Sequence, residues 1–385
     1  MNSLCVLPYI GVATDSTGGW KPCVVFDQKV SYREGNINDY FSSKWLKNLK
    51  EQHLKNEYPY GCRICERKDN RKVESVRKRE SDKFKNFEVN DSHSLKSIHI
   101  ILSNLCNQAC LMCTPKNSSL IYNETKKHLN DHVDHYRNIF SNLPNYTNSN
   151  LLNPYSNSDI LDLIEKIDIN ATIHITGGEP TIHQQVFYFL NLLIEKKLNR
   201  SVTLNFNTNF QTCNVKFLNL LKKFKGLCVG SIDGIGHKGQ FFRWNSNWKK
   251  INKNIKNFKK TCVNFDLTIA PTITILNVLY MNELVEWASI EKLKLRFNNQ
   301  LVEPQFLSIC NLPEYIKLEL CKKYKDIDKH ILNFENFKHH LFSNKTNKEI
   351  ISYIITQLEI NDKIRNSNFK KTLPELYNIL INYEN

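Results

Sequence analysis

Apolar and polar positions alternate in blocks along the middle of the chain, between residues 97 and 297. Short apolar runs such as Ile98-His99-Ile100-Ile101-Leu102 predict strands, and longer runs with apolar residues three or four positions apart predict helices. The expected strands are 97–102, 172–176, 202–207, 227–232, 265–273 and 292–297, and helices such as 185–197, 215–225, 247–258 and 281–290 fall between them. Six strand–helix units predict a parallel α/β sheet, because parallel neighbours need crossover connections. Periodicity alone leaves open whether this sheet is open or closed into a barrel.

The segments on either side follow other patterns. Near the N-terminus, strand-like runs at 9–14 and 20–25 flank a glycine-containing turn, and apolar residues at helical spacing predict a helix over 38–56. A basic run at 67–79 predicts a solvated linker helix, with a groove for an acidic leader peptide as the alternative. After residue 297 the alternation gives way to lysine-rich helices. We therefore expect four parts, residues 1–66, 67–94, 95–298 and 299–385.

Composition narrows the class of protein. The 385 residues are 41% hydrophobic and 11% aromatic, which suffices for a substantial core. The formal charge of +15 permits an acidic peptide or nucleic-acid partner, but a compositional drift in which lysine replaces arginine is the favoured explanation. Twelve cysteines without a secretory signal favour metal ligation in a reducing compartment over a disulfide scaffold. No apolar run reaches transmembrane length, so we expect a cytoplasmic protein without a membrane partner.

Three cysteines stand at spacing C-x3-C-x2-C directly after the first expected strand: Cys106, Cys110 and Cys113. A four-iron cluster needs one thiolate per iron, so three cysteines leave one iron open to a substrate or cofactor. This loop resembles the signature of the radical S-adenosylmethionine (SAM) enzymes. The resemblance selects an incomplete (β/α)6 barrel of the TIM type, and it implies a SAM-binding [4Fe-4S] cluster on these three cysteines.

Further polar segments follow the next three expected strands, at the edge where parallel barrels collect their chemistry. They are Gly177-Gly178-Glu179, Asn207-Thr208-Asn209 and Ser231-x-Asp233, and Arg243 lies ten residues beyond Asp233. By resemblance, the Gly-Gly-Glu segment contacts the amino group of SAM, and the others contact ribose or carboxylate. Met112 takes the place of the aromatic residue that the family usually has near adenine, and Phe210 takes the place of a glycine. A salt bridge on the following helix is the equal alternative for Arg243.

Four N-terminal cysteines, Cys5, Cys23, Cys62 and Cys65, stand at the edges of the expected hairpin and helix. Four thiolates suit zinc or a second four-iron cluster equally well. Their order resembles the twitch or SPASM-like auxiliary-cluster modules of radical SAM enzymes, here placed before the barrel, and this resemblance favours an auxiliary [4Fe-4S] cluster. His128, His132 and His135 have a metal-compatible helical spacing, but the charges between them favour a solvated face.

The resemblance as a whole implies an enzyme that cleaves SAM reductively to a 5′-deoxyadenosyl radical, which removes hydrogen from a substrate. An oxidative modification or cross-link of a peptide or protein is the first expectation, with flavodoxin or ferredoxin as an external electron donor. A radical SAM dehydrogenase of small molecules, a radical SAM enzyme acting on RNA, and a non-enzymatic protein that binds zinc or nucleic acid are the alternatives.

Overall fold

The computed structural model describes residues 4–86, 94–139, 153–297, 299–301 and 303–384. The chain folds into two compact units. The first consists of Met1–Leu105, Ser149–Phe206 and Asn214–Leu227, and the second of Cys106–Asn148, Asn207–Cys213 and Cys228–Asn385. The stretch 141–158 is rich in asparagine and serine, a composition that predicts an insertion before the second unit of the expected barrel, and its residues 141–152 lie outside the described residues.

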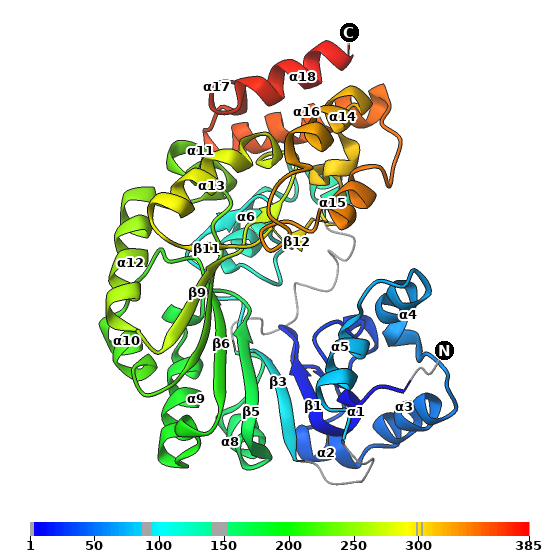
Figure 1. The fold of residues 1–385 in the computed structure, drawn as a ribbon, viewed down its shortest axis with the longest axis vertical. Helices are drawn as coiled ribbons and strands as arrows, with labels where there is room; N and C mark the ends of the chain where they lie inside the picture. Colours follow the sequence, from blue (N-terminus) through cyan, green and yellow to red (C-terminus); the bar gives the residue numbers. More distant parts are fainter. Residues whose placement is uncertain (1–3, 87–93, 140–152, 298, 302, 385) are drawn as a thin grey trace. The chain divides into compact units, whose positions relative to one another are not determined.

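A mostly parallel sheet forms the centre of the first unit (Figure 1). Its strands β3 (Leu95–Ile101), β5 (Ile167–Thr176) and β6 (Thr203–Thr208) pair in parallel, as the alternating pattern predicts. The N-terminal strand β1 (Gly11–Thr14) adds to this sheet in parallel beside β3, and β2 (Trp20–Lys21) completes an antiparallel hairpin with β1. The start of the expected strand 9–14 is wrong, because Leu7–Ile10 forms the short helix α1.

The two faces of this sheet differ in polarity. Ile98, Ile173, Leu204 and their apolar neighbours two residues along are buried on one face, where Phe206 of β6 packs against Phe217 of α10 (Val215–Leu221), with 5.7 Å between ring centroids. The opposite face carries half-buried polar side chains at the alternate positions: Ser97, His99, Thr172, His174, Thr203 and Asn205. Parallel strands are usually apolar on both faces, so a polar face indicates a function beyond packing.

Four helices complete the N-terminal part of the first unit. They are α2 (Ile37–Ser42), α3 (Lys44–Leu54), α4 (Arg63–Asn70) and α5 (Val76–Lys83). The single helix expected over 38–56 is divided at Ser43, whose backbone is extended and whose hydroxyl accepts a hydrogen bond from the Leu46 amide. An N-cap of this kind starts a new helix, because it supplies a partner to an amide that the first turn leaves unsatisfied. Helix α9 (Gln184–Glu195) agrees with the helix expected over 185–197, and α8 (Asn157–Glu165) lies before β5, where no helix was expected.

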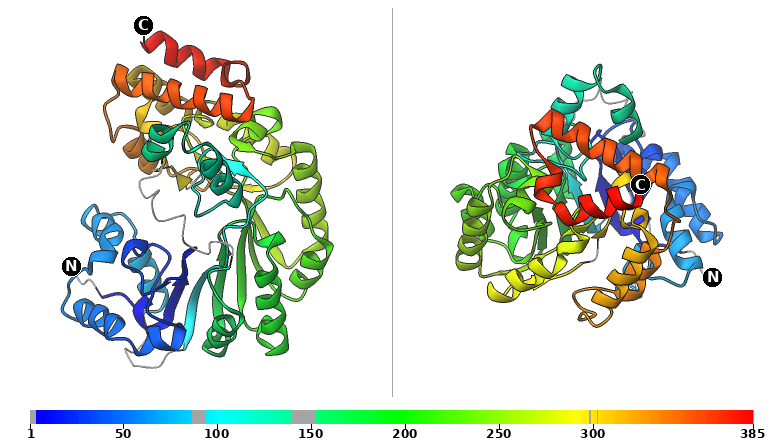
Figure 2. Two further views of the ribbon diagram at one scale, coloured as in Figure 1. Left: turned by 180° about the vertical axis from the view of Figure 1, so that it is seen from behind. Right: turned by 90° about the horizontal axis from the view of Figure 1, so that it is seen from above.

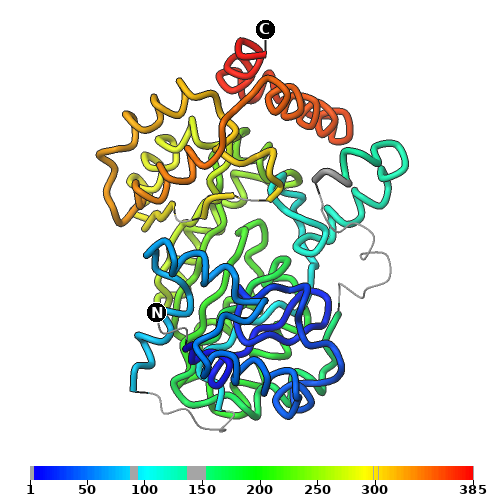
Figure 3. Tube along the Cα trace, turned by 90° about the vertical axis from the view of Figure 1, so that its right-hand side faces the viewer, coloured from blue at the N-terminus to red at the C-terminus, as the bar shows by residue number. Residues whose placement is uncertain are grey.

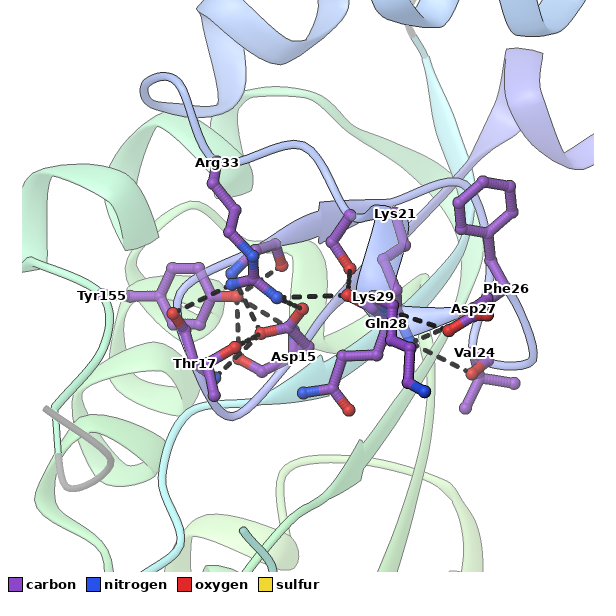
Figure 4. Close-up of polar contacts among 12 residues, drawn as sticks. Asp15, Thr17, Lys21, Val24, Phe26, Asp27, Gln28, Lys29, Arg33 and Tyr155 are labelled. Carbon is purple, nitrogen blue, oxygen red and sulfur yellow. Dashed lines mark hydrogen bonds and ion pairs between the residues drawn. The ribbon is translucent and has the colours of Figure 1, made fainter. Parts of the chain in front are cut away.

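The hairpin turn between β1 and β2 is fixed by a buried aspartate (Figure 4). Asp15 accepts hydrogen bonds from the Thr17 and Gly19 amides at 2.8 and 3.0 Å and forms an ion pair with Arg33 at 3.0 Å. The Tyr155 hydroxyl, far along the chain, accepts from the Asp15 amide and donates to the Gly19 carbonyl oxygen. The Asp15 side chain and the Tyr155 hydroxyl therefore both hold the turn in place.

Strand β7 (Gly226–Gly230) begins in the first unit, where the Leu204 amide donates to the Lys225 carbonyl just before it, and ends in the second, where Gly230 accepts from the Ala270 amide. In the second unit β9 (Phe265–Ile269) and β11 (Lys294–Leu295) pair in parallel. Two smaller pairs, β4 (Ala109–Cys110) with β8 (Arg243–Trp244) and β10 (Thr272–Ile273) with β12 (Asn299–Gln300), complete its strands.

The helices of the second unit include α6 (Ser119–His128), α7 (Val133–Ile139), α11 (Gly236–Phe242), α12 (Trp248–Thr261) and α13 (Met281–Ile290). Its C-terminal part is helical as expected: α14 (Glu314–Tyr324), α15 (Phe334–Leu341), α16 (Lys348–Arg365), α17 (Phe369–Thr372) and α18 (Pro374–Glu384). Helices α16 and α18 lie side by side (Figures 2 and 3). Among the described residues, no helix combines the length and the apolar character that crossing a membrane requires.

Candidate functional site

The loop that carries Cys106, Cys110 and Cys113 belongs to the second unit and is held by hydrogen bonds to helix α6 and strand β8. The start of helix α6 holds it, because the Cys106 amide donates to the Ser119 hydroxyl at 3.1 Å and the Ser118 hydroxyl donates to the Gln108 carbonyl at 2.7 Å. Cys110 also pairs with Arg243 in the short antiparallel ladder of β4 and β8. These contacts give the three thiols one defined loop conformation.

Donor groups surround the sulfur atoms of this loop. Arg243 Nη1 donates to Cys110 Sγ at 3.6 Å, and Asn209 Nδ2 donates to Cys106 Sγ at 3.8 Å and to Asn107 Oδ1 at 2.8 Å. A hydrogen bond with Cys113 lowers the pKa of the Cys110 thiol against the effect of burial, and the Arg243 charge lowers it further. The same bond and burial raise the pKa of Cys113 well above its usual value. Cys110 is thus the thiol of this pair that most readily becomes a thiolate.

Asp233 and Arg243 form a buried ion pair beside these thiols. The Arg243 Nε atom lies 2.6 Å from Asp233 Oδ2, and the Asp233 side chain is fully buried. The other carboxylate oxygen, Oδ1, accepts from the Thr272 amide at 2.7 Å. Arg243 therefore makes a salt bridge, although it lies in β8 and pairs with Asp233, which precedes α11, and not on the following helix as the alternative had it; it also contacts a cysteine of the loop.

The segment Asn207-Thr208-Asn209 spans the end of β6, and the chain turns sharply at Phe210 directly after it. Phe210, in the place of the family's glycine, has φ 56°, the left-handed conformation that a glycine adopts most easily. Its amide donates to Thr208 Oγ1 at 3.2 Å, and the Thr208 carbonyl accepts from the Ser231 amide at 2.9 Å. The turn typical of glycine is thus kept despite the aromatic side chain, which is buried against Phe258.

Gly177, Gly178 and Glu179 belong to the first unit, and they lie against the backbone of Ser103 and Leu105. A Cβ atom on Gly178 would lie 2.1 Å from the Leu105 carbonyl oxygen, and one on Gly177 would lie 2.8 Å from the Ser103 carbonyl oxygen. The Gly178 amide donates to Ser103 at 2.9 Å, and the Glu179 amide donates to Leu105 at 2.7 Å. These glycines allow the end of β5 to approach the residues directly before Cys106, an approach that sequence analysis had assigned to a ligand.

The Glu179 side chain is buried, and its Oε1 atom accepts from the amide and hydroxyl of Thr181 at 3.2 and 2.6 Å. Glu179 therefore caps the short 3-10 turn Pro180–Ile182, which fixes the direction of its carboxylate.

The four N-terminal cysteines lie in the first unit and influence one another electrostatically. Burial raises the pKa of Cys5 and of Cys62 far above the usual thiol value, and nearby thiols add to both shifts. Burial also raises the pKa of Cys23 to about 11, with a contribution from Cys65. The loop carrying Cys23 is held by Lys21, whose Nζ donates to the Val24 and Phe26 carbonyl oxygens at 3.2 and 3.4 Å (Figure 4).

The basic run 67–79 is only partly solvated. Arg77 points inward, where its Nε lies 2.7 Å from Asp69 Oδ2 and its Nη1 donates to the Leu4 carbonyl, directly before Cys5, at 3.2 Å. The Tyr58 hydroxyl donates to the same Asp69 oxygen at 2.9 Å. Arg77 therefore anchors helix α5 to the cysteine-bearing segment and is not part of a solvated face.

Sequence analysis missed the contribution of the C-terminal helices. Arg365 at the end of α16 binds both carboxylate oxygens of Glu124 on α6 at 2.9 Å, and its charge also lowers the pKa of Cys110. His135 is buried and hydrogen-bonded to Gln357 of α16, so the solvated face expected for its histidine series is wrong at this position.

Met112 is buried in the cysteine loop. Among the described residues, no group of three or more His, Cys, Asp or Glu has the arrangement of a site for a single metal ion.

No family model matches the chain, and no curated protein matches it. Solved structures show low similarity. A structure of polyhistidine-tagged anSMEcpe with bound AdoMet has 18% identity and a TM-score of 0.44, with 60% of this chain and 59% of that chain covered. Streptococcus suis SuiB bound to its precursor peptide SuiA has 16% identity and a TM-score of 0.32, with 69% and 45% covered. TYW1 with a lysine-pyruvate adduct has 11% identity and a TM-score of 0.33, with 71% and 91% covered.

The matched region spans about three fifths of the anSMEcpe chain. A shared fold does not follow from TM-scores this low, so the functional assignment depends on this chain's own residues.

Proposed function

We propose that this protein is a radical SAM enzyme that modifies a peptide or protein, with a [4Fe-4S] cluster on Cys106, Cys110 and Cys113. The observation that carries the proposal is the pair of donors aimed at the loop's sulfur atoms, Arg243 on Cys110 and Asn209 on Cys106. Hydrogen bonds to ligand sulfurs tune iron–sulfur clusters and orient their ligands. Three thiols on one fixed loop, two of them bonded by such donors, fit a cluster with one open iron.

SAM would be held by residues that already have fixed directions. We assign the acceptor for its ammonium group to Glu179, because Thr181 orients that carboxylate. Met112 and the polar groups at Asn207, Thr208, Asn209 and Ser231 would complete the contacts. When bound, the cluster supplies the electron that cleaves SAM reductively.

Asp233 has a different proposed role. Both of its carboxylate oxygens are engaged, one by Arg243 and one by the Thr272 amide. We propose that Asp233 acts by positioning Arg243, which in turn orients Cys110, and that it does not bind ribose directly.

We further propose an auxiliary [4Fe-4S] cluster on Cys5, Cys23, Cys62 and Cys65, within a twitch-like segment 1–66 that precedes a basic linker 67–94 and a partial barrel 95–298. The support is that burial and mutual repulsion raise the pKa of Cys5 and Cys62, as expected for thiols gathered in one buried place. An external carrier such as flavodoxin or ferredoxin would deliver the electrons. Helices 299–385 would support the cysteine loop, because α16 already holds α6 through Arg365 and Glu124.

Metal analysis tests this assignment. After anaerobic reconstitution with iron and sulfide, about eight irons per chain are expected from two four-iron clusters. A variant with all of Cys106, Cys110 and Cys113 replaced by alanine should keep half of that iron, and the corresponding variant of the N-terminal four should keep the other half. Cys213→Ala is the matched control and should keep all of it. A colourless protein that holds only zinc would overturn the proposal in favour of a zinc-binding protein.

A further inference from the structure

A cavity of about 330 Å³ lies in the first unit, against the polar face of the sheet. Its volume is within the range of small-molecule sites, which begins at about 300 Å³. Strands β3, β5 and β6 line it with Ser97, His99, Thr172, His174 and Asn205. Apolar side chains, Val12, Val24 and Ile98 among them, line the rest of the cavity. The polar part of the lining can hydrogen-bond a polar group of a ligand, and the apolar part can contact its carbon chain.

The polar wall is organised by the register of the strands. His99 pairs with His174 and His174 with Asn205, so the three side chains form one row across three strands. The two imidazole rings lie 5.0 Å apart, and His99 Nε2 is 2.7 Å from Thr176 Oγ1. Asn205 Oδ1 accepts from the Leu227 amide at 3.0 Å, which fixes the orientation of its carboxamide. The row thus presents oriented side chains that can donate hydrogen bonds.

Helix α5 supplies the charged wall. The cavity is lined by Val76, Arg79, Glu80 and Lys83, which share one helical face because they are spaced three or four residues apart. Lys83 Nζ donates to Thr172 Oγ1 at 3.4 Å, and Arg79 is paired with Glu80 at 2.9 Å. The neighbouring Arg77 takes no part, since it is bound to Asp69. Two cations and one anion give this wall a formal charge of +1.

We propose that this cavity binds a carboxylate group, which the cations of α5 attract and the row His99, His174 and Asn205 holds by hydrogen bonds. A carboxylate carries one negative charge and matches the +1 wall, whereas a phosphate monoester carries about −1.5 to −2 at neutral pH. Cys23, one of the four N-terminal cysteines, also lines the cavity, so the carboxylate would lie beside this residue. The inference rests on the proposed function in one respect only: the molecule that carries this carboxylate is taken to be the substrate of the enzyme.

The test is equilibrium binding to the full-length protein, prepared anaerobically and without SAM, so that its result is independent of SAM cleavage. Three probes are titrated by calorimetry: propionate as a free acid with one carboxylate, N-acetylglutamate amide as an acidic peptide side chain, and N-acetylglutamine amide as the neutral counterpart. At least one acid should bind saturably, and the neutral counterpart should bind at least about tenfold more weakly, because hydrogen bonds to charged groups exceed those to neutral ones. Which acid binds more tightly distinguishes a free acid from a peptide side chain.

Two variants locate the binding. Lys83→Gln should weaken acid binding about two- to fivefold at low salt, as expected for an exposed charge, whereas Lys216→Gln on α10 is the matched control and should have no effect. His174→Phe should weaken it at least about tenfold, through loss of a hydrogen bond to a charged group. The proposal is overturned if neither acid binds, if the glutamine compound binds as tightly as the glutamate compound, or if Lys83→Gln and His174→Phe both bind the acids as the parent does. If the acids bind but the protein never cleaves SAM, the carboxylate site stands and only the assignment of its ligand as a substrate is refuted.

Discussion

Breaking the buried ion pair between Asp233 and Arg243 on one side should destabilise the second unit by several kilocalories per mole. The pair's Nε–Oδ2 distance is 2.6 Å, and the two side chains are 12% and 0% exposed. Removing one partner of a buried pair leaves an uncompensated charge and typically costs about 3 to 5 kcal/mol. In Arg243→Met the Asp233 carboxylate keeps its hydrogen bond from the Thr272 amide, so we expect the lower end of that range, about 3 kcal/mol.

The double variant Arg243→Met with Asp233→Asn separates the pair from its surroundings. Because the neutral amide no longer needs a cation, the double variant should be more stable than the sum of the single effects predicts, by about 1 to 3 kcal/mol. Local opening energies are measured by hydrogen–deuterium exchange of peptides covering β8 and β9, under anaerobic conditions without metal. Lys238→Met is the control, because its partly exposed ion pair with Glu283 should contribute at most about 1 kcal/mol. Additivity of the two single variants to within about 0.5 kcal/mol would refute the coupling.

Three further predictions concern single residues. Burial, with the nearby charge of His174, lowers the pKa of His99 from 6.5 to about 3. Between these two pKa values the unfolded chain binds more protons than the folded chain. The stability that neutral His99 contributes is therefore complete above pH 6.5 and is lost as the pH falls towards 3, at up to about 1.4 kcal/mol per pH unit. In urea unfolding between pH 4 and 7, the free energy of unfolding of His99→Gln should depend less on pH than that of the parent, and an equal dependence would contradict this. Gly178→Ala should lower iron retention after reconstitution, because its Cβ atom would clash with the Leu105 carbonyl. Gly236→Ala is the control, because its Cβ atom would have no neighbour within 4 Å and should cost only backbone strain of about 1 kcal/mol. Similar iron retention in both variants would count against the packing argument. Arg77→Met should destabilise the first unit by about 3 kcal/mol, because it leaves the buried Asp69 carboxylate without its cation, and an unchanged urea midpoint would refute this role.

Local patterns predicted much of the secondary structure. Helix α13 has the bounds that its apolar spacing predicts, and each expected strand of the central repeat overlaps an observed one, although β5 begins five residues earlier than expected. The expected strand 265–273 is divided into β9 and β10 at Ala270 and Pro271, and Thr272, the first residue of β10, donates its amide to Asp233. Pro271 is a local signal for such a break, because proline lacks the amide that a strand interior uses, whereas the bond to Asp233, almost forty residues away, is not encoded in local spacing.

Other features depend on contacts between distant segments. Strand β1 pairs with β3 although the paired residues are more than eighty positions apart. The cavity likewise depends on a distant contact, because Arg79 and Lys83 of α5 line it together with the polar face of the sheet. One signal for that face was present in the sequence, because His99 and His174 each stand between two isoleucines. A single polar residue in an apolar strand predicts little, and only the strand register shows that the two histidines are neighbours.

The central claim is SAM cleavage at the cluster of Cys106, Cys110 and Cys113. The most direct measurement is the amount of 5′-deoxyadenosine formed from SAM by the reconstituted, iron-loaded protein with a strong reductant, beside the variant in which these three cysteines are alanine. The account predicts 5′-deoxyadenosine from the parent protein and none above background from the variant. Equal amounts from both, or failure of SAM to bind a protein whose first cluster is demonstrably loaded, would contradict it.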